Sequence, residues 1–165
     1  MKTIKFIAAC ALLASAGAVF SHENTPHHHS AAPVAKEQKD WGIAGDARAV
    51  RRTIAIRMTD DMRFAPRHIE VREGETVRLR AENKGQVLHE IVIGTRAALD
   101  AHADMMARHP GMEHGEPHMA HVAPGKKGDI VWHFNRPGRF DFACLIPGHY
   151  QAGMTGTITV LPRKP

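Results

Sequence analysis

The chain has 165 residues, a formal net charge of +5 and 43% hydrophobic residues, which suits one sandwich-sized core rather than several domains. Only 5% of the residues are aromatic, and Arg78 and Arg80 alternate with apolar residues, as on the solvent face of a strand. With few rings to stack on bases and no basic stripe, a nucleic-acid partner is not expected.

The first 21 residues are expected to form a secretory signal peptide. Lys2 and Lys5 give a basic start, an apolar run follows, and small residues come after it. The run is too short for a membrane span, so we expect no integral membrane segment after cleavage and a location in the periplasm. Cys10 is removed with this segment, which leaves Cys144 as a lone thiol that is free to bind metal.

Residues 22–47 are expected to form a flexible tail. Pro26 and Pro33 flank a stretch of small residues, and mixed charge follows it. The tract His27-His28-His29 within this tail either binds metal or is an ordinary part of a soluble segment.

Residues 48–165 are expected to form one β-rich domain. Short segments of alternating apolar and polar residues are separated by Gly, Pro and Asn turn signals. Short strands at this spacing predict an all-β sandwich. The predicted strands are Thr53–Met58, His68–Arg72, Thr76–Glu82, Leu88–Ile93, Ile130–Phe134, Arg139–Cys144 and Thr155–Val160.

An insertion at about residues 96–124 separates the fourth and fifth of these strands and is rich in methionine and histidine. Arg96 to His109 can form a helix that ends before Pro110, and its sulfur and imidazole groups then share one face. That stripe either packs on the sandwich or binds metal, whereas the run beyond Pro110 has little apolar patterning and favours metal binding. Thioethers suit Cu(I), and imidazoles take Cu(II) or zinc. The candidate accessory ligands are His102, Met105, Met106, His109, Met112, His114, His118, Met119 and His121.

The segment Phe142 to Met154 carries the strongest chemical signal. It places Cys144, His149 and Met154 at Cys-x4-His-x4-Met spacing within one short loop. A thiolate, imidazoles and a weak axial thioether suit a copper ion that cycles between Cu(I) and Cu(II). The loop lacks one histidine for such a site.

His89 is the best candidate for the missing ligand, because strand parity places it on the same side as the others. Alternate residues of a strand face one side. Every second residue after His89 is apolar, namely Ile91 and Ile93. Every second residue before Cys144 is a phenylalanine for two steps, and the same spacing after Met154 leads to Ile158 and Val160. All three ligands therefore share the apolar, inward phase of their strands. His133 and His68 are expected at the surface.

From about Ile54 to Val160 the chain resembles the cupredoxins, a family of small blue-copper-type β-sandwich proteins. Besides the ligand loop, Met62 to Pro66 and Ile69 to Val77 are similar to the opening strands and turn of that family. The resemblance implies an all-β, Greek-key β-sandwich with a partly helical Met/His-rich insertion. It also implies type 1 copper held by His89, Cys144, His149 and, axially, Met154. Many members have Asn after the first histidine, where it ties two ligand loops together, whereas this chain has Glu90.

Two functions remain open on the sequence. The arrangement resembles periplasmic copper-resistance cupredoxins, which join such a site to Met/His-rich segments, and this implies a role in copper tolerance and homeostasis. The alternative is a soluble periplasmic electron carrier, for which Ile146, Pro147, Ala152 and Met154 are expected to form an apolar rim around His149. The expected partners are copper ions and a periplasmic redox or copper-handling protein.

Enzymatic activity is not expected. A multicopper oxidase needs a trinuclear cluster built from His-x-His pairs, and none occurs outside His27-His28-His29. A dinuclear electron-entry site needs two cysteines in its loop, and only Cys144 is present. A cuprous-ion oxidase activity, in which Cu(I) from the insertion is oxidised through the cupredoxin copper, stays compatible with the sequence.

Overall fold

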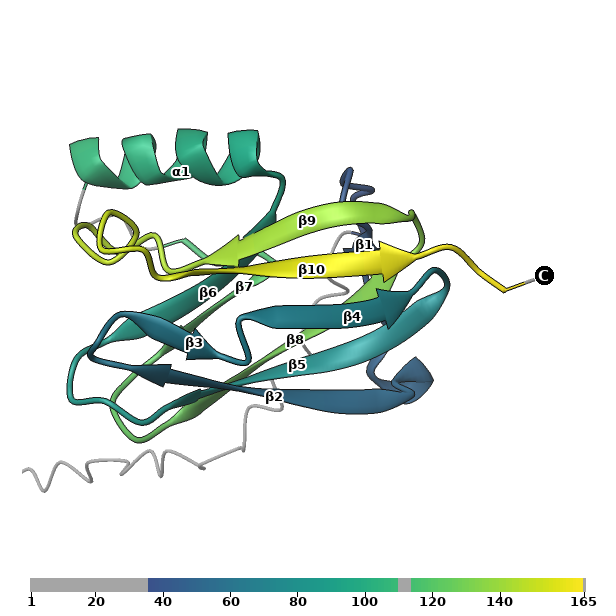
Figure 1. Cartoon of the computed structure of the whole chain (residues 1–165), viewed down its shortest axis with the longest axis horizontal. Helices are drawn as coiled ribbons and strands as arrows, with labels where there is room; N and C mark the ends of the chain where they lie inside the picture. Colours follow the sequence, from purple (N-terminus) through teal and green to yellow (C-terminus); the bar gives the residue numbers. More distant parts are fainter. Residues whose placement is uncertain (1–35, 110–113, 165) are drawn as a thin grey trace, which may run out of the picture. The chain divides into compact units, whose positions relative to one another are not determined.

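The computed structural model describes residues 36–109 and 114–164, which form two sheets packed face to face (Figure 1). The expected signal peptide, the tract His27-His28-His29 and Met112 lie outside the described residues. None of the helices in the described ranges combines the length and the apolar character that a membrane crossing requires.

Each sheet has five strands, and all seven strands expected from the sequence are found in them. The first sheet has the order β1-β8-β5-β2-β3, and the second has the order β4-β10-β9-β6-β7. The all-β sandwich prediction is therefore confirmed. The bounds are β1 Ile43–Ala44, β2 Arg52–Thr59, β3 Arg63–Ala65, β4 His68–Arg72, β5 Glu75–Asn83, β6 His89–Gly94, β7 Met119–Val122, β8 Lys127–Phe134, β9 Gly138–Ala143 and β10 Thr155–Leu161, with a 3-10 turn at Ala47–Ala49.

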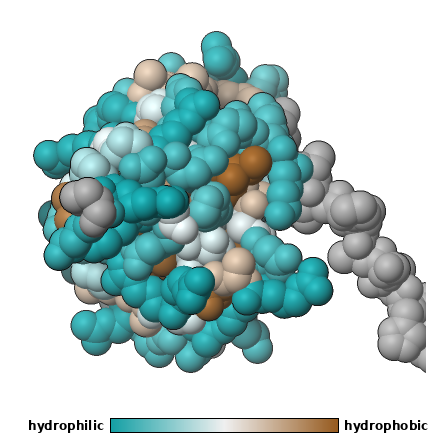
Figure 2. Space-filling model, turned by 90° about the vertical axis from the view of Figure 1, so that its right-hand side faces the viewer, coloured by the Kyte–Doolittle hydropathy of each residue, from teal (hydrophilic) through white to brown (hydrophobic). Residues whose placement is uncertain are grey.

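The core follows the period-two pattern of the strands. In β5, Val77 and Leu79 are buried between the sheets, while Arg78 and Arg80 point outward. Both arginines form ion pairs with Asp129 of the neighbouring β8. The arginines therefore lie on the outer face of the sheet, as expected, but both are only partly exposed. The end of the sandwich near the C-terminal end of β10 is largely hydrophilic, with apolar side chains only in small separate patches (Figure 2).

Strand β6 differs from the others because every one of its residues is buried. One face of β6 lies in the core between the sheets, and the other is covered by α1, Arg96–Arg108 (Figure 1). Thr95 is the N-cap of this helix, and its Oγ1 accepts a hydrogen bond from the Ala98 N–H at 3.2 Å. Leu99 and Ala103 of α1 form a second apolar cluster with Val92 of β6 and residues of β9 and the ligand loop.

Three short strands, β1, β3 and β7, are not among the seven expected strands, and β1 lies outside the expected domain boundary. Ile43–Ala44 pairs with β8, and the carbonyl of the buried Trp41 accepts a hydrogen bond from Trp132 Nε1 at 2.8 Å. The domain therefore extends N-terminally of the expected boundary at residue 48. Strand β7 comes from the insertion and pairs with β6, so the insertion completes the sheet beside its helix.

Candidate metal centre

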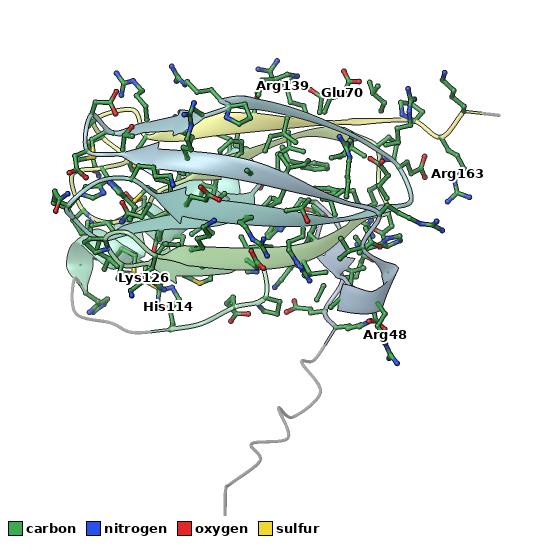
Figure 3. The ribbon with its side chains drawn as sticks, turned by 90° about the horizontal axis from the view of Figure 1, so that it is seen from below. Arg48, Glu70, His114, Lys126, Arg139 and Arg163 are labelled. Carbon is green, nitrogen blue, oxygen red and sulfur yellow. The ribbon has the colours of Figure 1, made fainter. Side chains whose placement is uncertain are left out.

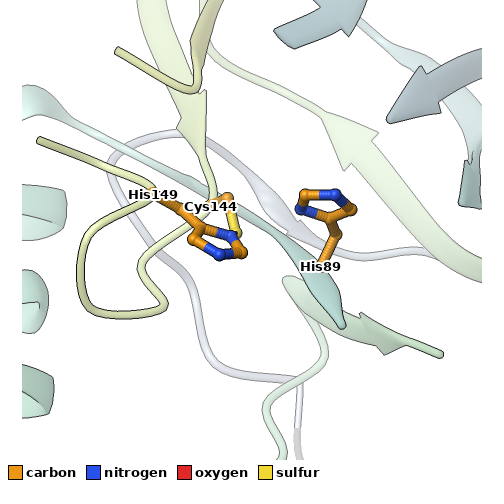
Figure 4. Close-up of side chains that lie close together, drawn as sticks. All are labelled: His89, Cys144 and His149. Carbon is orange, nitrogen blue, oxygen red and sulfur yellow. The ribbon is translucent and has the colours of Figure 1, made fainter. Parts of the chain in front are cut away.

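Strand β6 and the loop after β9 bring three metal-ligating side chains together at one end of the core. The donor atoms of His89, Cys144 and His149 all lie within 4.8 Å of one another (Figure 4). Atoms bound to one ion at about 2.0–2.3 Å lie roughly 3–4 Å apart, so the trio needs only small movements to close around a metal. A thiolate and two imidazoles are the equatorial set of a type 1 copper site.

The orientation of His89 is set by Asp60 from the turn after β2. Nε2 of His89 lies 3.0 Å from Asp60 Oδ1, and Nδ1 is buried without a hydrogen-bond partner among the described residues. The same carboxylate accepts the Gln86 N–H at 2.7 Å, and this bond, more than the one from His89, lowers the pKa of Asp60. An orphaned, buried imidazole nitrogen beside a thiol fits a bound metal.

The ligand loop is closed at its base by backbone hydrogen bonds. The Cys144 N–H donates to the Met154 carbonyl and the Met154 N–H to the His149 carbonyl, both at 3.1 Å. These bonds hold the His149 ring so that Nδ1 lies 3.3 Å from Cys144 Sγ. The loop therefore presents its thiol and imidazole to the same point.

Met154 begins the return to β10 and is fully buried in the core between the sheets. The inward phase expected from strand parity is found, since Cys144 and Met154 belong to this core and His89, in phase with the core residues Ile91 and Ile93, is fully buried. Gly156 is the next residue in the same phase. The position needs a glycine because the Phe142 ring occupies the space of a side chain there: a Cβ on Gly156 would lie 2.1 Å from that ring.

Burial controls the protonation of the site. It raises the pKa of the Cys144 thiol to about 12, against the opposing effect of the Glu90 and Ile146 N–H groups. Burial also lowers the pKa of His149, and the neighbouring His89 lowers it further. At neutral pH the metal-free site is therefore a neutral thiol beside a neutral His149, and metal binding must displace the thiol proton.

Glu90 takes the place where many cupredoxins have Asn, and it does tie the ligand segments together. Its backbone N–H lies 3.4 Å from Cys144 Sγ, and its Oε1 accepts the Leu145 N–H at 2.9 Å. Its other oxygen lies 2.8 Å from Nε2 of His121 on β7. The side chain is fully buried, and this burial raises its pKa, against the opposing effects of Leu145 and His121.

Three of the candidate accessory ligands come together near Glu90, and we call His102, His114 and His121 the histidine cluster. Nε2 of His102 lies 2.7 Å from Nε2 of His114, and the rings of His114 and His121 are 6.3 Å apart. The ring of His114 is also 4.8 Å from that of His102. One ligand comes from α1, one from the segment after it and one from β7.

The other candidate accessory residues within the described ranges do not join this cluster. Met106 is buried, Met119 packs in the apolar cluster under α1, and Met105 is half-buried. His109 is exposed at the end of the helix. His118 lies between Trp41 and Trp132, with ring distances of 5.4 and 6.0 Å, and burial lowers its pKa.

His68 lies at the surface, as expected, whereas His133, which was expected there too, is only partly exposed. His68 is exposed with Nδ1 2.8 Å from Thr157 Oγ1, and His133 is half-buried with Nδ1 2.9 Å from Thr76 Oγ1. Sequence reasoning missed Asp60 as a partner of the first ligand. An acidic residue in an exposed turn carries no distinguishing signal until the turn is placed beside β6.

Comparison with known proteins agrees with this geometry. Residues 51–161 match the family described as copper binding proteins of the plastocyanin/azurin family. The solved auracyanin from Roseiflexus castenholzii has a TM-score of 0.59 and 25% identity, and the match covers 68% of this chain and 99% of auracyanin. An azurin from Methylomonas, with a TM-score of 0.56 and 18% identity over 70% of this chain and all of the azurin, supports the fold alone.

Closer relatives in sequence carry a description of copper resistance. A protein of Rubrivivax gelatinosus called copper-resistant cuproprotein CopI is 47% identical over 138 residues, covering 81% of this chain and 84% of the relative. The protein of the same name from Pseudomonas aeruginosa is 36% identical, covering 74% of this chain and 83% of the relative. On the match of residues 51–161, this chain belongs to the plastocyanin/azurin family of copper-binding proteins.

Proposed function

We propose that this protein binds one copper ion at a type 1 site made by His89, Cys144, His149 and Met154, and that it acts in periplasmic copper tolerance. The observation that carries the site is the convergence of three donor atoms within 4.8 Å of one another in a buried position. Nδ1 of His89 is buried there without a hydrogen-bond partner among the described residues. His149 is half-buried and gives the site an edge toward solvent.

The tolerance role is supported by the insertion and by the relatives. An electron carrier needs one protected copper and a docking surface, and gains nothing obvious from a histidine cluster. The relatives named as copper-resistant cuproproteins match most of this chain. In the proposed role, the histidine cluster and the Met/His-rich insertion bind further copper, while the type 1 site holds a single ion.

The alternative function is electron transfer, and one surface feature favours it. Val87 and Leu88, directly before His89, are 42% and 46% exposed and are large apolar side chains. A small apolar surface next to a copper ligand suits brief contact with a redox partner. If electron transfer is the function, the histidine cluster in the insertion is not required for it.

The site itself is tested by colour. Copper-loaded protein is expected to show an intense thiolate-to-copper charge-transfer band, and Cys144→Ser is expected to abolish it because Cys144 supplies the sulfur anion. Met58→Leu, a change of another buried sulfur residue, serves as the control and keeps the band. A band that survives in Cys144→Ser contradicts the assignment.

The role is tested by copper challenge of a strain that lacks the protein. Point substitutions are preferable to deletion, because residues 102–121 include half of α1 and most of β7. Complementation is expected to fail with Cys144→Ser and to weaken with His102→Ala/His114→Ala, while His68→Ala restores tolerance. Protein levels in each strain are compared by immunoblot. A strain that tolerates copper normally but loses a redox activity, restored by the cluster variant, supports the electron carrier instead.

A further inference from the structure

The buried residue Glu90 contacts both the copper thiol and the histidine cluster. On one side its backbone N–H points at Cys144 Sγ, at 3.4 Å, and its Oε1 holds the Leu145 N–H at 2.9 Å. On the other side its Oε2 lies 2.8 Å from Nε2 of His121. Glu90 thus contacts the thiol of the copper site on one side and a member of the histidine cluster on the other.

The backbone gives this contact a fixed geometry. Glu90 and His121 face each other as a cross-strand pair of β6 and β7. Strand β6 is buried on both faces, so Glu90 cannot turn away to solvent. His121 is partly exposed, with 37% of its side chain accessible, and it stands next to His114, which contacts His102. His114 and Lys126 lie at one end of the sandwich, and Arg163 lies at the other end (Figure 3).

We propose that Glu90 is a positioning residue that transmits cation binding at the histidine cluster to the type 1 copper. A cation bound by the cluster is attracted to the Glu90 carboxylate, whose Oε2 contacts His121 and whose Oε1 holds the Leu145 N–H. The hydrogen bonds of Glu90 and Leu145 then change at the thiolate. This inference rests on the copper binding proposed above for both sites.

The sign of the coupling follows from charge. A cation near the centre favours the copper state with the smaller positive charge, which is Cu(I), so cluster occupation raises the Cu(II)/Cu(I) potential. By reciprocity, the reduced protein binds the cluster cation more tightly than the oxidised protein does. We expect a difference of about fivefold, the low end for coupled sites, which equals about 41 mV in a one-electron potential.

Zn²⁺ is the probe, because it is colourless and redox-inert and does not displace Cu(II) from a site of this kind. Zn²⁺ is added to the copper-loaded full mature chain while its binding is followed by calorimetry and the charge-transfer band and potential by spectroscopy. His102→Ala/His114→Ala removes the cluster and keeps the histidine-containing tail. His68→Ala is the matched control for loss of a histidine elsewhere.

The expected result is a band shift and a rise in potential that saturate with cluster binding in the wild type and in His68→Ala. Both responses are absent in His102→Ala/His114→Ala. In Glu90→Gln, whose amide oxygen still accepts the Leu145 N–H, Zn²⁺ binds but the responses fall by more than half. If that variant does not fold, His121→Gln removes the contact between His121 and Glu90 instead. At saturating Zn²⁺ this variant is expected to lose the same share of the band shift and of the rise in potential.

Three outcomes overturn the inference. Zn²⁺ binding at the cluster with an unchanged band and potential refutes the coupling and leaves the accessory site intact. Equal Zn²⁺ binding by wild type and His102→Ala/His114→Ala refutes the coupling together with the cluster as a metal site. A full response in both Glu90→Gln and His121→Gln shows that the field acts through space and that Glu90 has no such role.

Discussion

Asp60 Oδ1 lies 3.0 Å from Nε2 of His89, so a carboxylate from the β2–β3 turn orients the ligand supplied by β6. The contact leaves Nδ1 of a fully buried imidazole facing the thiol. A carboxylate partner makes an imidazole a stronger donor and stabilises Cu(II) over Cu(I). The two residues are 29 positions apart in the sequence, and only the fold brings them into contact.

Asp60→Asn is therefore expected to weaken Cu(II) binding by about tenfold and to raise the potential. Competition titration and redox titration measure the two effects. Asp61→Asn changes the adjacent exposed carboxylate, which contacts Thr59, and is expected to leave both quantities unchanged. Equal behaviour of the two variants contradicts an orienting role for Asp60.

The buried thiol predicts a pH dependence of stability in the metal-free protein. Because the pKa of Cys144 is about 12 in the folded chain and 9.0 in its ordinary state, the folded state favours the protonated thiol. This contribution is complete below about pH 9 and is lost as the pH rises toward 12, by about 1.4 kcal/mol for each pH unit.

Chemical unfolding of the metal-free protein at pH 7, 9 and 10.5 measures this dependence. Cys144→Ala carries every other titrating group and is expected to lose less stability over the same range, which isolates the thiol. Parallel pH profiles for the two proteins are the result that this interpretation does not allow.

Met154→Leu is expected to keep copper and raise the potential. The thioether is a long, weak axial donor. Its loss destabilises Cu(II) more than Cu(I), because Cu(I) is stable with three ligands. Met58→Leu is the control, because Met58 is equally buried in the same core but does not belong to the ligand loop. Cyclic voltammetry gives the comparison, and a Met154→Leu potential equal to that of the control removes Met154 from the site.

Gly156→Ala is expected to destabilise the protein by about 1–3 kcal/mol, because its methyl group meets the Phe142 ring at 2.1 Å. The double change Gly156→Ala/Phe142→Leu relieves the clash and recovers part of the loss. Gly115→Ala, where nothing lies within 4 Å of the new Cβ, is the control. Thermal unfolding distinguishes the variants, and a neutral Gly156→Ala contradicts the packing described here.

Most of the fold was readable because β-strand parity is a local signal. The phases of His89, Cys144 and Met154 each continue through apolar residues on the same strand, and burial of one face enforces that pattern. The short strands Ile43–Ala44 and Met119–Val122 were missed because pairing with β8 and β6, rather than their own composition, makes them strands.

The accessory residues were less predictable, because helix spacing cannot say which face meets the sandwich. His102, Met105, Met106 and His109 share a stripe in the sequence, but packing of Leu99 and Ala103 on β6 and β9 buries Met106 and leaves His109 exposed. The partner of His102 is His114, which lies 12 residues further along the chain, beyond the end of the helix. Helix spacing does not relate two residues of which only one lies in the helix.

The closure of the ligand loop on β6 links copper uptake to folding. Cys144, His149 and Met154 are neighbours in the chain, but His89 reaches them only after β6 has paired with β9. An unfolded chain offers the same donors without their common position, so copper favours the native state by mass action, by about 2.7 kcal/mol when free copper is 100 times its dissociation constant. Bound copper would therefore also protect the protein from unfolding and from proteolysis of the unfolded chain.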